Sequence, residues 1–300
     1  MIDGHSHMLA GLAIKSPDTG VARENAFSMD ELFGVMDNLG IEKLVTFVQE
    51  TERIYGDWLG SNENAIELQK KFPDRIIGIV GAEPMDSRNI FHRTRLDELR
   101  GAVSQHGIRG VCLTPPYGHF YANDRRAYPF YELAVELDFA VMFHHGGGVG
   151  GGGGNAWEGP IKYARPVVLD DLVVDFPELR IHVEHMAYPW SEELFAIMKH
   201  GPNVYTDVAE LFSRPTILSW YIMMAKEYGV ISRVVWGSDY DVFWRSPVEA
   251  ASYGEKAQKE ISWLKKDLNE ILHKSGWPTL TEEEIAGILG ENSKSFFRLP

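Results

Sequence analysis

Short apolar runs typical of β-strands alternate with stretches of helical spacing along the whole chain. Leu32, Val35, Met36 and Leu39 keep to one helical face, and Gly40 ends that helix. Strands are expected at residues 1–7, 43–48, 76–81, 108–113, 140–144, 180–185, 203–208 and 233–236. Helices are expected at residues 28–40, 62–72, 92–105, 128–137, 166–175, 191–200 and 215–228. Eight strand–helix alternations predict an α/β fold, a closed (β/α)8 TIM barrel.

The chain beyond the eighth expected strand has only helical patterns. One apolar stripe runs through Ile261, Leu264, Leu268, Ile271 and Leu272. Thr281 and Glu284 have the spacing of a capping box at the start of a last helix. We therefore expect a single domain over residues 1–300, with a helical extension from about residue 255.

An open, doubly wound sheet is the alternative fold. It would need a glycine-rich phosphate turn after an early strand. The glycine segment at residues 146–154 instead follows the fifth expected strand and lacks the GxGxxG pattern. Such a composition also suits a linker between domains. Because strand–helix units continue on both sides of it, we expect a mobile loop over the barrel mouth.

Charge and cysteine content restrict the classes of partner and compartment. Acidic residues outnumber basic ones by 43 to 29, and the formal net charge is −14. Such a surface repels phosphate backbones, so we expect no nucleic-acid partner. Cys112 is the only cysteine, which rules out an internal disulfide. The sequence has no apolar stretch that could span a bilayer and no room for a signal peptide before the first strand, so we expect a cytoplasmic protein without a membrane partner.

His5 and His7 are the first candidates for chemistry. Side chains two residues apart on a strand point to the same side, so these imidazoles make half of a metal site. Two surface histidines are the ordinary alternative. His144, His185 and Asp239 follow the fifth, sixth and eighth expected strands. Because barrel active sites lie at the C-terminal ends of the strands, we expect these five residues at one rim.

The alternation of faces along the strands gives a further expectation. With His144 inward, Ala140 and Met142 point inward, while Val141, Phe143 and His145 face the helices. His145 is then expected in the loop or behind the site. With His185 inward, Ile181 and Val183 join it, which sends His182 and Glu184 into the apolar helix layer. Only a pairing of His182 with Glu184 or a frayed register would explain that.

Four segments resemble the signatures of the amidohydrolase superfamily. They are Ile-Asp-Gly-His-Ser-His, Phe-His-His-Gly, Glu-His-Met-Ala and Trp-Gly-Ser-Asp-Tyr. The chain is most similar to the amidohydrolase-related branch that contains aminocarboxymuconate-semialdehyde decarboxylase and resorcylate decarboxylase. Residues 64–84 and 288–292 resemble further segments of that branch.

The resemblance implies a metal site and a catalytic residue. His5, His7, His144 and Asp239 would hold one divalent metal, and His185 would be the catalytic histidine. Relatives with two metals carry a carbamylated lysine on the fourth strand, where this chain has Cys112. One metal is therefore expected, with Cys112 as a buried structural cysteine in preference to a ligand.

Two reactions suit these residues. In a hydrolysis, the metal would acidify a water for attack on a lactone or amide carbonyl, Asp239 would take the proton, and His185 would stabilise the oxyanion. In a decarboxylation of an aromatic or enol-type carboxylate, Asp239 or His185 would protonate carbon. We expect the hydrolase first and the decarboxylase almost equally. Zinc is the expected metal and manganese the alternative.

The expected rim loops also contain residues suited to a small, aromatic or carboxylated substrate. The candidates are Arg53, His119, Trp157, Tyr188 and Arg214, with Arg245 and other aromatic residues as weaker ones. Each of these arginines could equally form a surface ion pair. A barrel that only binds a ligand is the alternative from another class. Relatives are often dimers, so a homodimer is an expectation from resemblance.

Overall fold

The computed structural model describes all residues except 9–12, 16–21, 25–26, 56–57, 146–158 and 242–248. Among the described residues, the main sheet has nine strands in the order β10-β9-β8-β7-β6-β5-β4-β1-β11. They are β1 (Ile2–His7), β4 (Lys43–Phe47), β5 (Ile76–Gly81), β6 (Gly110–Leu113), β7 (Ala140–Phe143), β8 (Arg180–Val183), β9 (Val204–Asp207), β10 (Val234–Val235) and β11 (Tyr240–Asp241). All neighbouring pairs are parallel.

The sheet closes into a barrel because both ends of the strand order come from one stretch of chain. β10 pairs with β9, and β11 pairs with β1 on the other side of the seam. Between them, the Gly4 N–H donates to the Trp236 carbonyl at 2.9 Å. The expected TIM barrel is confirmed, with the eighth strand interrupted between β10 and β11.

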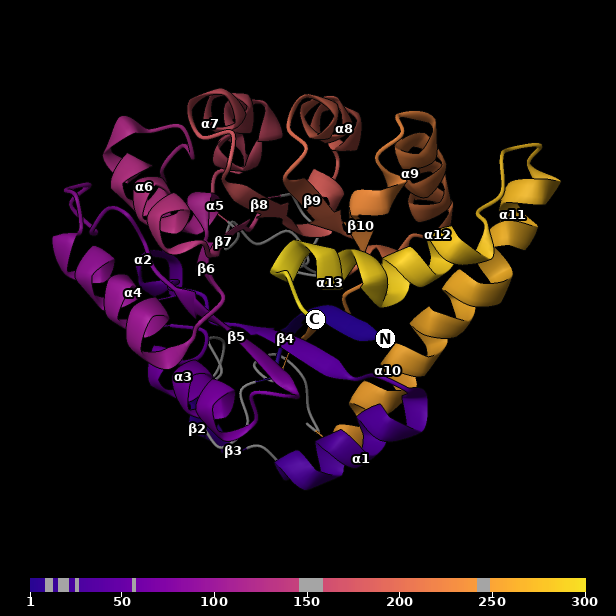
Figure 1. Ribbon diagram of the computed structural model, residues 1–300, viewed down its shortest axis with the longest axis horizontal. Helices are drawn as coiled ribbons and strands as arrows, with labels where there is room; N and C mark the ends of the chain where they lie inside the picture. Colours follow the sequence, from indigo (N-terminus) through magenta and orange to yellow (C-terminus); the bar gives the residue numbers. More distant parts are fainter. Residues whose placement is uncertain (9–12, 16–21, 25–26, 56–57, 146–158, 242–248) are drawn as a thin grey trace.

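Helices surround the barrel and form its outer layer (Figure 1). They are α1 (Met29–Leu39), α3 (Asn62–Lys71), α4 (Arg93–His106), α6 (Tyr128–Leu137), α7 (Leu169–Asp175), α8 (Ser191–His200) and α9 (Pro215–Glu227), with the short α2 (Glu52–Tyr55) and α5 (Pro115–Gly118) on loops after β4 and β6. Ser28 and Glu31 form a capping box at the start of α1. No described helix is both long and apolar enough to cross a lipid bilayer.

The C-terminal helices complete the outer layer and cover one end of the barrel. α10 (Ala250–Ser262) packs against α1, and α11 (Leu268–Lys274) packs against α9. α12 (Glu282–Ala286) begins at the predicted capping box of Thr281 and Glu284. α13 (Asn292–Phe297) then crosses the end of the barrel where the strands begin, close to both chain termini (Figure 1). The helical extension is therefore part of the barrel's packing.

The barrel interior is a small apolar core below the polar mouth. Its members are Ile2, Val45, Phe47, Ile77, Ile79, Cys112, Ala140, Met142, Phe296 and Phe297. The two phenylalanines of α13 fill the interior from the strands' N-terminal end, and the Arg180 guanidinium fixes that helix by donating to the Phe296 carbonyl at 2.6 Å. As predicted, Ala140 and Met142 point inward while Val141 and Phe143 pack with the helices.

The predicted faces of the sixth strand are wrong. Ile181 and Val183 pack in the outer core with the helices, and His182 points inward. β8 ends at Val183, and His185 has a left-handed backbone with φ 56°. The alternation of faces assumed a strand that continued to residue 185. Because it stops earlier, a turn brings His185 to the mouth together with the inward His182 and Glu184.

Two further differences concern the loops. The stretch after β1, expected as a loop, contains an antiparallel hairpin of β2 (Ala13–Lys15) and β3 (Ala22–Glu24). Its hydrophobic pattern is too short to separate a strand pair from a loop. The glycine segment at 146–154 lies outside the described residues, so the expected loop over the mouth stays a prediction.

A buried carboxyl group joins α10 to the end of β10. The Trp236 indole N–H donates to Glu260 Oε2 at 3.0 Å, and the Lys256 ammonium lies 3.1 Å from Oε1. Burial raises the pKa of Glu260 to about 8, although Lys256 and the indole oppose the rise. The folded protein therefore holds a proton here that the unfolded chain releases near its ordinary pKa of 4.5.

This linkage gives a stability prediction. Because the folded-state pKa is raised, the contribution of Glu260 is full below about pH 4.5 and is lost as the pH rises towards 8. Glu260→Gln keeps an acceptor for Trp236 but cannot lose a proton. Urea unfolding should show the parent losing on the order of 3 kcal/mol more than the variant between pH 5 and pH 8. Equal pH dependence in both proteins would contradict the assignment.

Candidate metal centre

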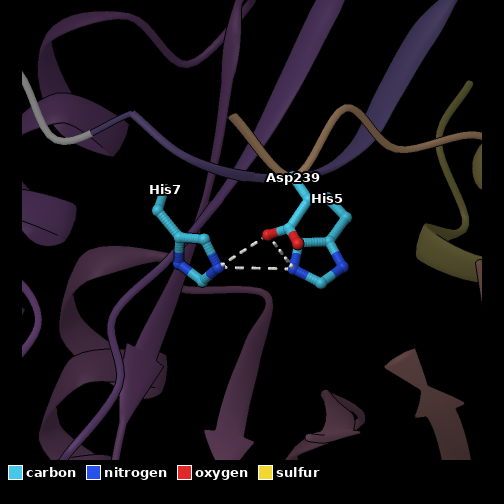
Figure 2. A group of neighbouring side chains, drawn as sticks. All are labelled: His5, His7 and Asp239. Carbon is cyan, nitrogen blue, oxygen red and sulfur yellow. Dashed lines mark hydrogen bonds and ion pairs between the residues drawn. The ribbon is translucent and has the colours of Figure 1, made fainter. Parts of the chain in front are cut away.

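Three side chains at the barrel mouth form a compact triangle of ligand atoms (Figure 2). The Nε2 atoms of His5 and His7 lie 3.3 Å apart, and Asp239 Oδ1 lies 3.3 Å from each of them. A tetrahedral zinc ion with bonds of about 2.0–2.1 Å separates its ligand atoms by about 3.3–3.4 Å. The observed triangle therefore fits one face of such a coordination sphere.

The local backbone brings the three residues together. The register of β1 against β4 shifts between Asp3 and Ser6, a segment that includes His5, and His5 and His7 both direct their rings into the mouth. Asp239, in the stretch between β10 and β11, has a left-handed φ of 47° and donates its N–H to the His5 carbonyl at 2.8 Å. Strained backbone of this kind is concentrated at functional sites.

An oxygen acceptor lies beside the Nδ1 atom of four rings at the mouth, those of His5, His7, His144 and His185. His5 Nδ1 lies 2.9 Å from Asp207 Oδ2, and His144 Nδ1 lies 2.7 Å from Glu184 Oε2. His7 Nδ1 lies 3.2 Å from the Phe47 carbonyl, and His185 Nδ1 lies 3.3 Å from the Ala209 carbonyl. Carbonyl and carboxylate oxygens only accept hydrogen bonds. Nδ1 therefore carries the hydrogen of each neutral ring, and the lone pair of the ring lies on Nε2.

His185 lies beside the triangle. Its ring centroid is 5.1 Å from that of His5, and His185, Glu184 and His5 form a second buried group whose ligand atoms lie within 4.8 Å of one another. Residues 185–187 all have positive φ, at 56°, 51° and 49°. This left-handed turn positions His185 and Glu184 on the same side, which the strand pattern could not indicate.

His144 reaches the mouth but belongs to neither described group of ligand atoms. Its ring centroid lies 5.4 Å from that of His185, and the Tyr117 ring stacks on it at 4.8 Å. The structure thus brings His144 next to His185 and Glu184, and His185 in turn lies beside His5 of the triangle. Its role as a fourth ligand stays a prediction.

Buried acidic and imidazole side chains at the mouth shift one another's pKa values. Burial lowers the pKa of His5, but Asp207, Asp239 and Glu184 outweigh this, and the pKa rises well above its usual value. Burial raises the carboxyl pKa values, yet His5 above all holds the pKa of Glu184 down to about 2 and those of Asp207 and Asp239 well below the usual range. Burial lowers the pKa of His185 despite nearby Asp239. Deprotonated carboxylates are what a cation site requires, and the raised pKa of His5 reflects the negative charge around it, which a bound cation would neutralise in place of a proton.

Cys112 and His145 are the other candidates near this end of the barrel. The buried Cys112 thiol donates to Glu184 Oε1 at 3.5 Å, and burial, with the charge of Glu184, raises its pKa well above the usual value. A neutral thiol fits the expected structural role. His145 is fully buried beside Phe143 with centroids 5.6 Å apart, and burial lowers its pKa to about 3.

The structure places four of the five candidate substrate residues. Arg53 donates to the Asp86 carbonyl at 2.8 Å, and its charge, after burial, lowers the pKa of His119. The Arg214 guanidinium lies over the Tyr188 ring at 5.4 Å. Arg53 therefore lies near His119, and Arg214 lies against Tyr188. Trp157 and Arg245 lie outside the described residues.

Sequence reasoning missed one buried acid and misplaced another. Asp207 ends β9 and contacts both His5 and His182. The signal available was its position, because a carboxylate at the C-terminal end of a barrel strand faces the site. Glu184 was expected among the helices and instead contacts His144.

Comparison with known proteins identifies the family and gives the same fold. The sequence profile described as amidohydrolase matches residues 2–299. The chain belongs to the amidohydrolase family. Family members are enzymes, so this chain is an enzyme of that family. A search of curated protein sequences finds no significant match.

Solved structures share the fold of this amidohydrolase at low sequence identity. A probable 2-pyrone-4,6-dicarboxylic acid hydrolase from Acinetobacter baumannii, with citric acid bound, has 18% identity and a TM-score of 0.65 over 99% of this chain and 98% of that one. A 5-carboxyvanillate decarboxylase from Novosphingobium aromaticivorans, complexed with manganese, has 14% identity and a TM-score of 0.60 over 92% and 81%. A 4-oxalomesaconate hydratase from Rhodopseudomonas palustris has 19% identity and a TM-score of 0.56 over 100% and 96%.

Proposed function

We propose that this amidohydrolase is a metal-dependent hydrolase of a small lactone or amide, with an aromatic or carboxylated substrate. One divalent cation would be held by His5, His7 and Asp239, with His144 as the fourth ligand. The triangle of equal 3.3 Å separations carries the proposal. Two imidazole nitrogens and a carboxylate oxygen at equal spacing offer a cation three ligand atoms at the separations of one coordination sphere.

The nature of the donors indicates the metal. Three imidazoles and one carboxylate suit zinc, which binds nitrogen and oxygen ligands and can expand to five-coordinate, so that one position stays open for water. Manganese, present in the carboxyvanillate decarboxylase neighbour, is the alternative. When bound, the cation supplies an acidified water and polarises the substrate carbonyl.

The surrounding side chains would transfer protons, stabilise the oxyanion and bind the substrate. Asp239 lies against both His5 and His7, and it would take the proton of the attacking water. His185 directs an initially bare Nε2 into the site because its Nδ1 donates to the Ala209 carbonyl. After receiving the water's proton from Asp239, it would stabilise the developing oxyanion or pass that proton to the leaving group. Arg53 or Arg214 would hold a substrate carboxylate.

Decarboxylation is the second candidate function. Neighbouring structures are named as decarboxylases of 5-carboxyvanillate and 2,6-dihydroxybenzoate. In this chain the Tyr117 ring stacks on His144 at 4.8 Å, which offers an aromatic surface beside the site. The same His185 or Asp239 would then protonate the carbon that loses carbon dioxide.

The test is a substrate panel offered to the zinc-loaded and the manganese-loaded protein. Lactones, amides and hydroxybenzoates would be followed by acid release and by carbon dioxide release. We expect acid release from a lactone or amide, absent from the metal-free protein. Carbon dioxide release from a hydroxybenzoate would replace hydrolysis by decarboxylation. Metal-free protein that binds aromatic carboxylates without turnover would support a binding barrel instead.

A further inference from the structure

We propose that Asp207 and Glu184 are positioning residues that fix the Nδ1–H form of His5 and His144, so that Nε2 of each ring is committed to the metal. This inference rests on the proposed metal site and adds two residues to it. The two carboxylates lie at the adjacent ends of β9 and β8, behind the rings and outside the triangle of ligand atoms.

Asp207 has a complete set of donors. Oδ2 accepts from His5 Nδ1 at 2.9 Å and from His182 Nε2 at 2.6 Å. Oδ1 accepts from the backbone N–H groups of His185 at 2.9 Å and Ala209 at 3.0 Å. A carboxylate has about four acceptor positions, and all four are used. Asp207 is therefore an anion that holds its neighbours and has no free lone pair for a metal.

This saturation determines the orientation of His5. Since Asp207 can only accept, the hydrogen of the neutral ring must be on Nδ1. Nε2 is then bare and lies 3.3 Å from both His7 Nε2 and Asp239 Oδ1. The opposite tautomer would leave a bare Nδ1 facing the carboxylate and would point an N–H into the cation position.

Glu184 repeats the arrangement on His144. Oε2 accepts from His144 Nδ1 at 2.7 Å, while Oε1 accepts from the Cys112 thiol at 3.5 Å. The neutral thiol occupies the second oxygen and turns the first towards His144. Glu184 is completely buried, so its charge is available to the ring with little screening by water.

The four imidazoles thus fall into two classes. His7 and His185 donate Nδ1–H to neutral backbone carbonyls, whereas His5 and His144 donate to carboxylates. A carboxylate partner makes the opposite nitrogen a stronger donor to a metal, and loss of such a partner lowers metal affinity 10- to 100-fold. His5 and His144 should therefore be the two strongest imidazole ligands.

The experiment measures metal affinity in Asp207→Asn and Glu184→Gln by competition with a chelator for zinc. Each variant removes the charge and one acceptor with almost no change in volume. We expect each to bind zinc about 10- to 100-fold more weakly. Glu260→Gln is the matched control, because it makes the same carboxyl-to-amide change at a buried position outside the mouth and should bind zinc normally. Thermal melting of the metal-free proteins establishes that the variants fold.

A spectroscopic readout separates positioning from general damage. In the cobalt(II)-substituted protein, each imidazole bound through Nε2 gives a paramagnetically shifted Nδ1–H proton signal that disappears in D2O. Each variant should lose or shift the signal of its own histidine and leave the others in place. If one variant does not fold, the other variant still tests the positioning role of the carboxylate that it replaces.

The outcomes are distinguishable from failure of the proposed function. Parent protein that binds no divalent ion would remove the metal site itself. A parent that binds metal, with variants that bind equally well and keep all exchangeable signals, would overturn only the positioning role. Two ions per parent chain would make Glu184 a ligand of the second ion and would also overturn its positioning role.

Discussion

Asp239→Asn should lower kcat/KM on the best substrate of the panel by a factor on the order of 10⁴. Asp239 contributes an oxygen to the triangle, and in the proposed mechanism it also accepts a proton. Asparagine keeps the size and can still place an oxygen near the cation, but it has no charge and cannot take a proton. The measurement is steady-state kinetics at saturating metal, which isolates the proton transfer from weaker metal binding.

The control for this prediction is a comparison of the variant's fold with that of the parent protein. Asp239 donates its N–H to the His5 carbonyl through the backbone, which the substitution leaves in place. The far-ultraviolet circular dichroism spectrum of Asp239→Asn should therefore match that of the parent. A variant with parental kcat/KM would exclude Asp239 from proton transfer and leave His185 as the acceptor.

His144→Ala should abolish retention of the metal while the barrel still folds. His144 is the only proposed ligand outside the triangle, and without it the cation would have three protein ligands. The ring is partly exposed, with 17% of the side chain accessible, and it lies outside the apolar core, so the barrel should fold although Glu184 loses a donor. The measurement is metal content after dialysis against a chelator.

A matched variant makes this result specific. His273 lies exposed in α11, far along the chain from the residues of the mouth, and His273→Ala should retain one ion per chain. If His144→Ala also retained its ion, His144 would not be a ligand. Its contact with Glu184 would then serve another purpose, and the four-ligand site would be wrong in that one residue.

The sequence was sufficient for the barrel and for the meeting of His5, His7 and Asp239. Alternating strand and helix patterns are long-range regularities, and they predict that residues at strand ends share one rim. The shared direction of His5 and His7 follows from their spacing of two residues on one strand. Asp239 needed the correct count of strands, which the eight predicted strands provided.

The finer positions depended on backbone features that carry no pattern. The turn at residues 185–187 has positive φ without glycine, so nothing in the sequence indicated that β8 ends at Val183. Arguments from alternation therefore assigned Glu184 to the wrong side. The irregularity in β1 between Asp3 and Ser6 is equally hidden. Tertiary contacts stabilise such strained segments, and those contacts come from distant strands.

Asp207 illustrates a different limit. A single aspartate at a strand end is common, and no local motif marked it. Its importance comes from four donors on His5, His182, His185 and Ala209, which three different parts of the chain supply. A network of this kind can be identified only when the strands have been placed next to one another.

The most direct test of the central claim is anomalous diffraction from crystals of the zinc-loaded protein, recorded on both sides of the zinc absorption edge. We expect one strong peak at about 2.0–2.2 Å from His5 Nε2, His7 Nε2 and an oxygen of Asp239, with His144 as the fourth ligand. A protein saturated with zinc whose anomalous peak lies elsewhere, with the triangle of His5, His7 and Asp239 unchanged and free of metal, would contradict it.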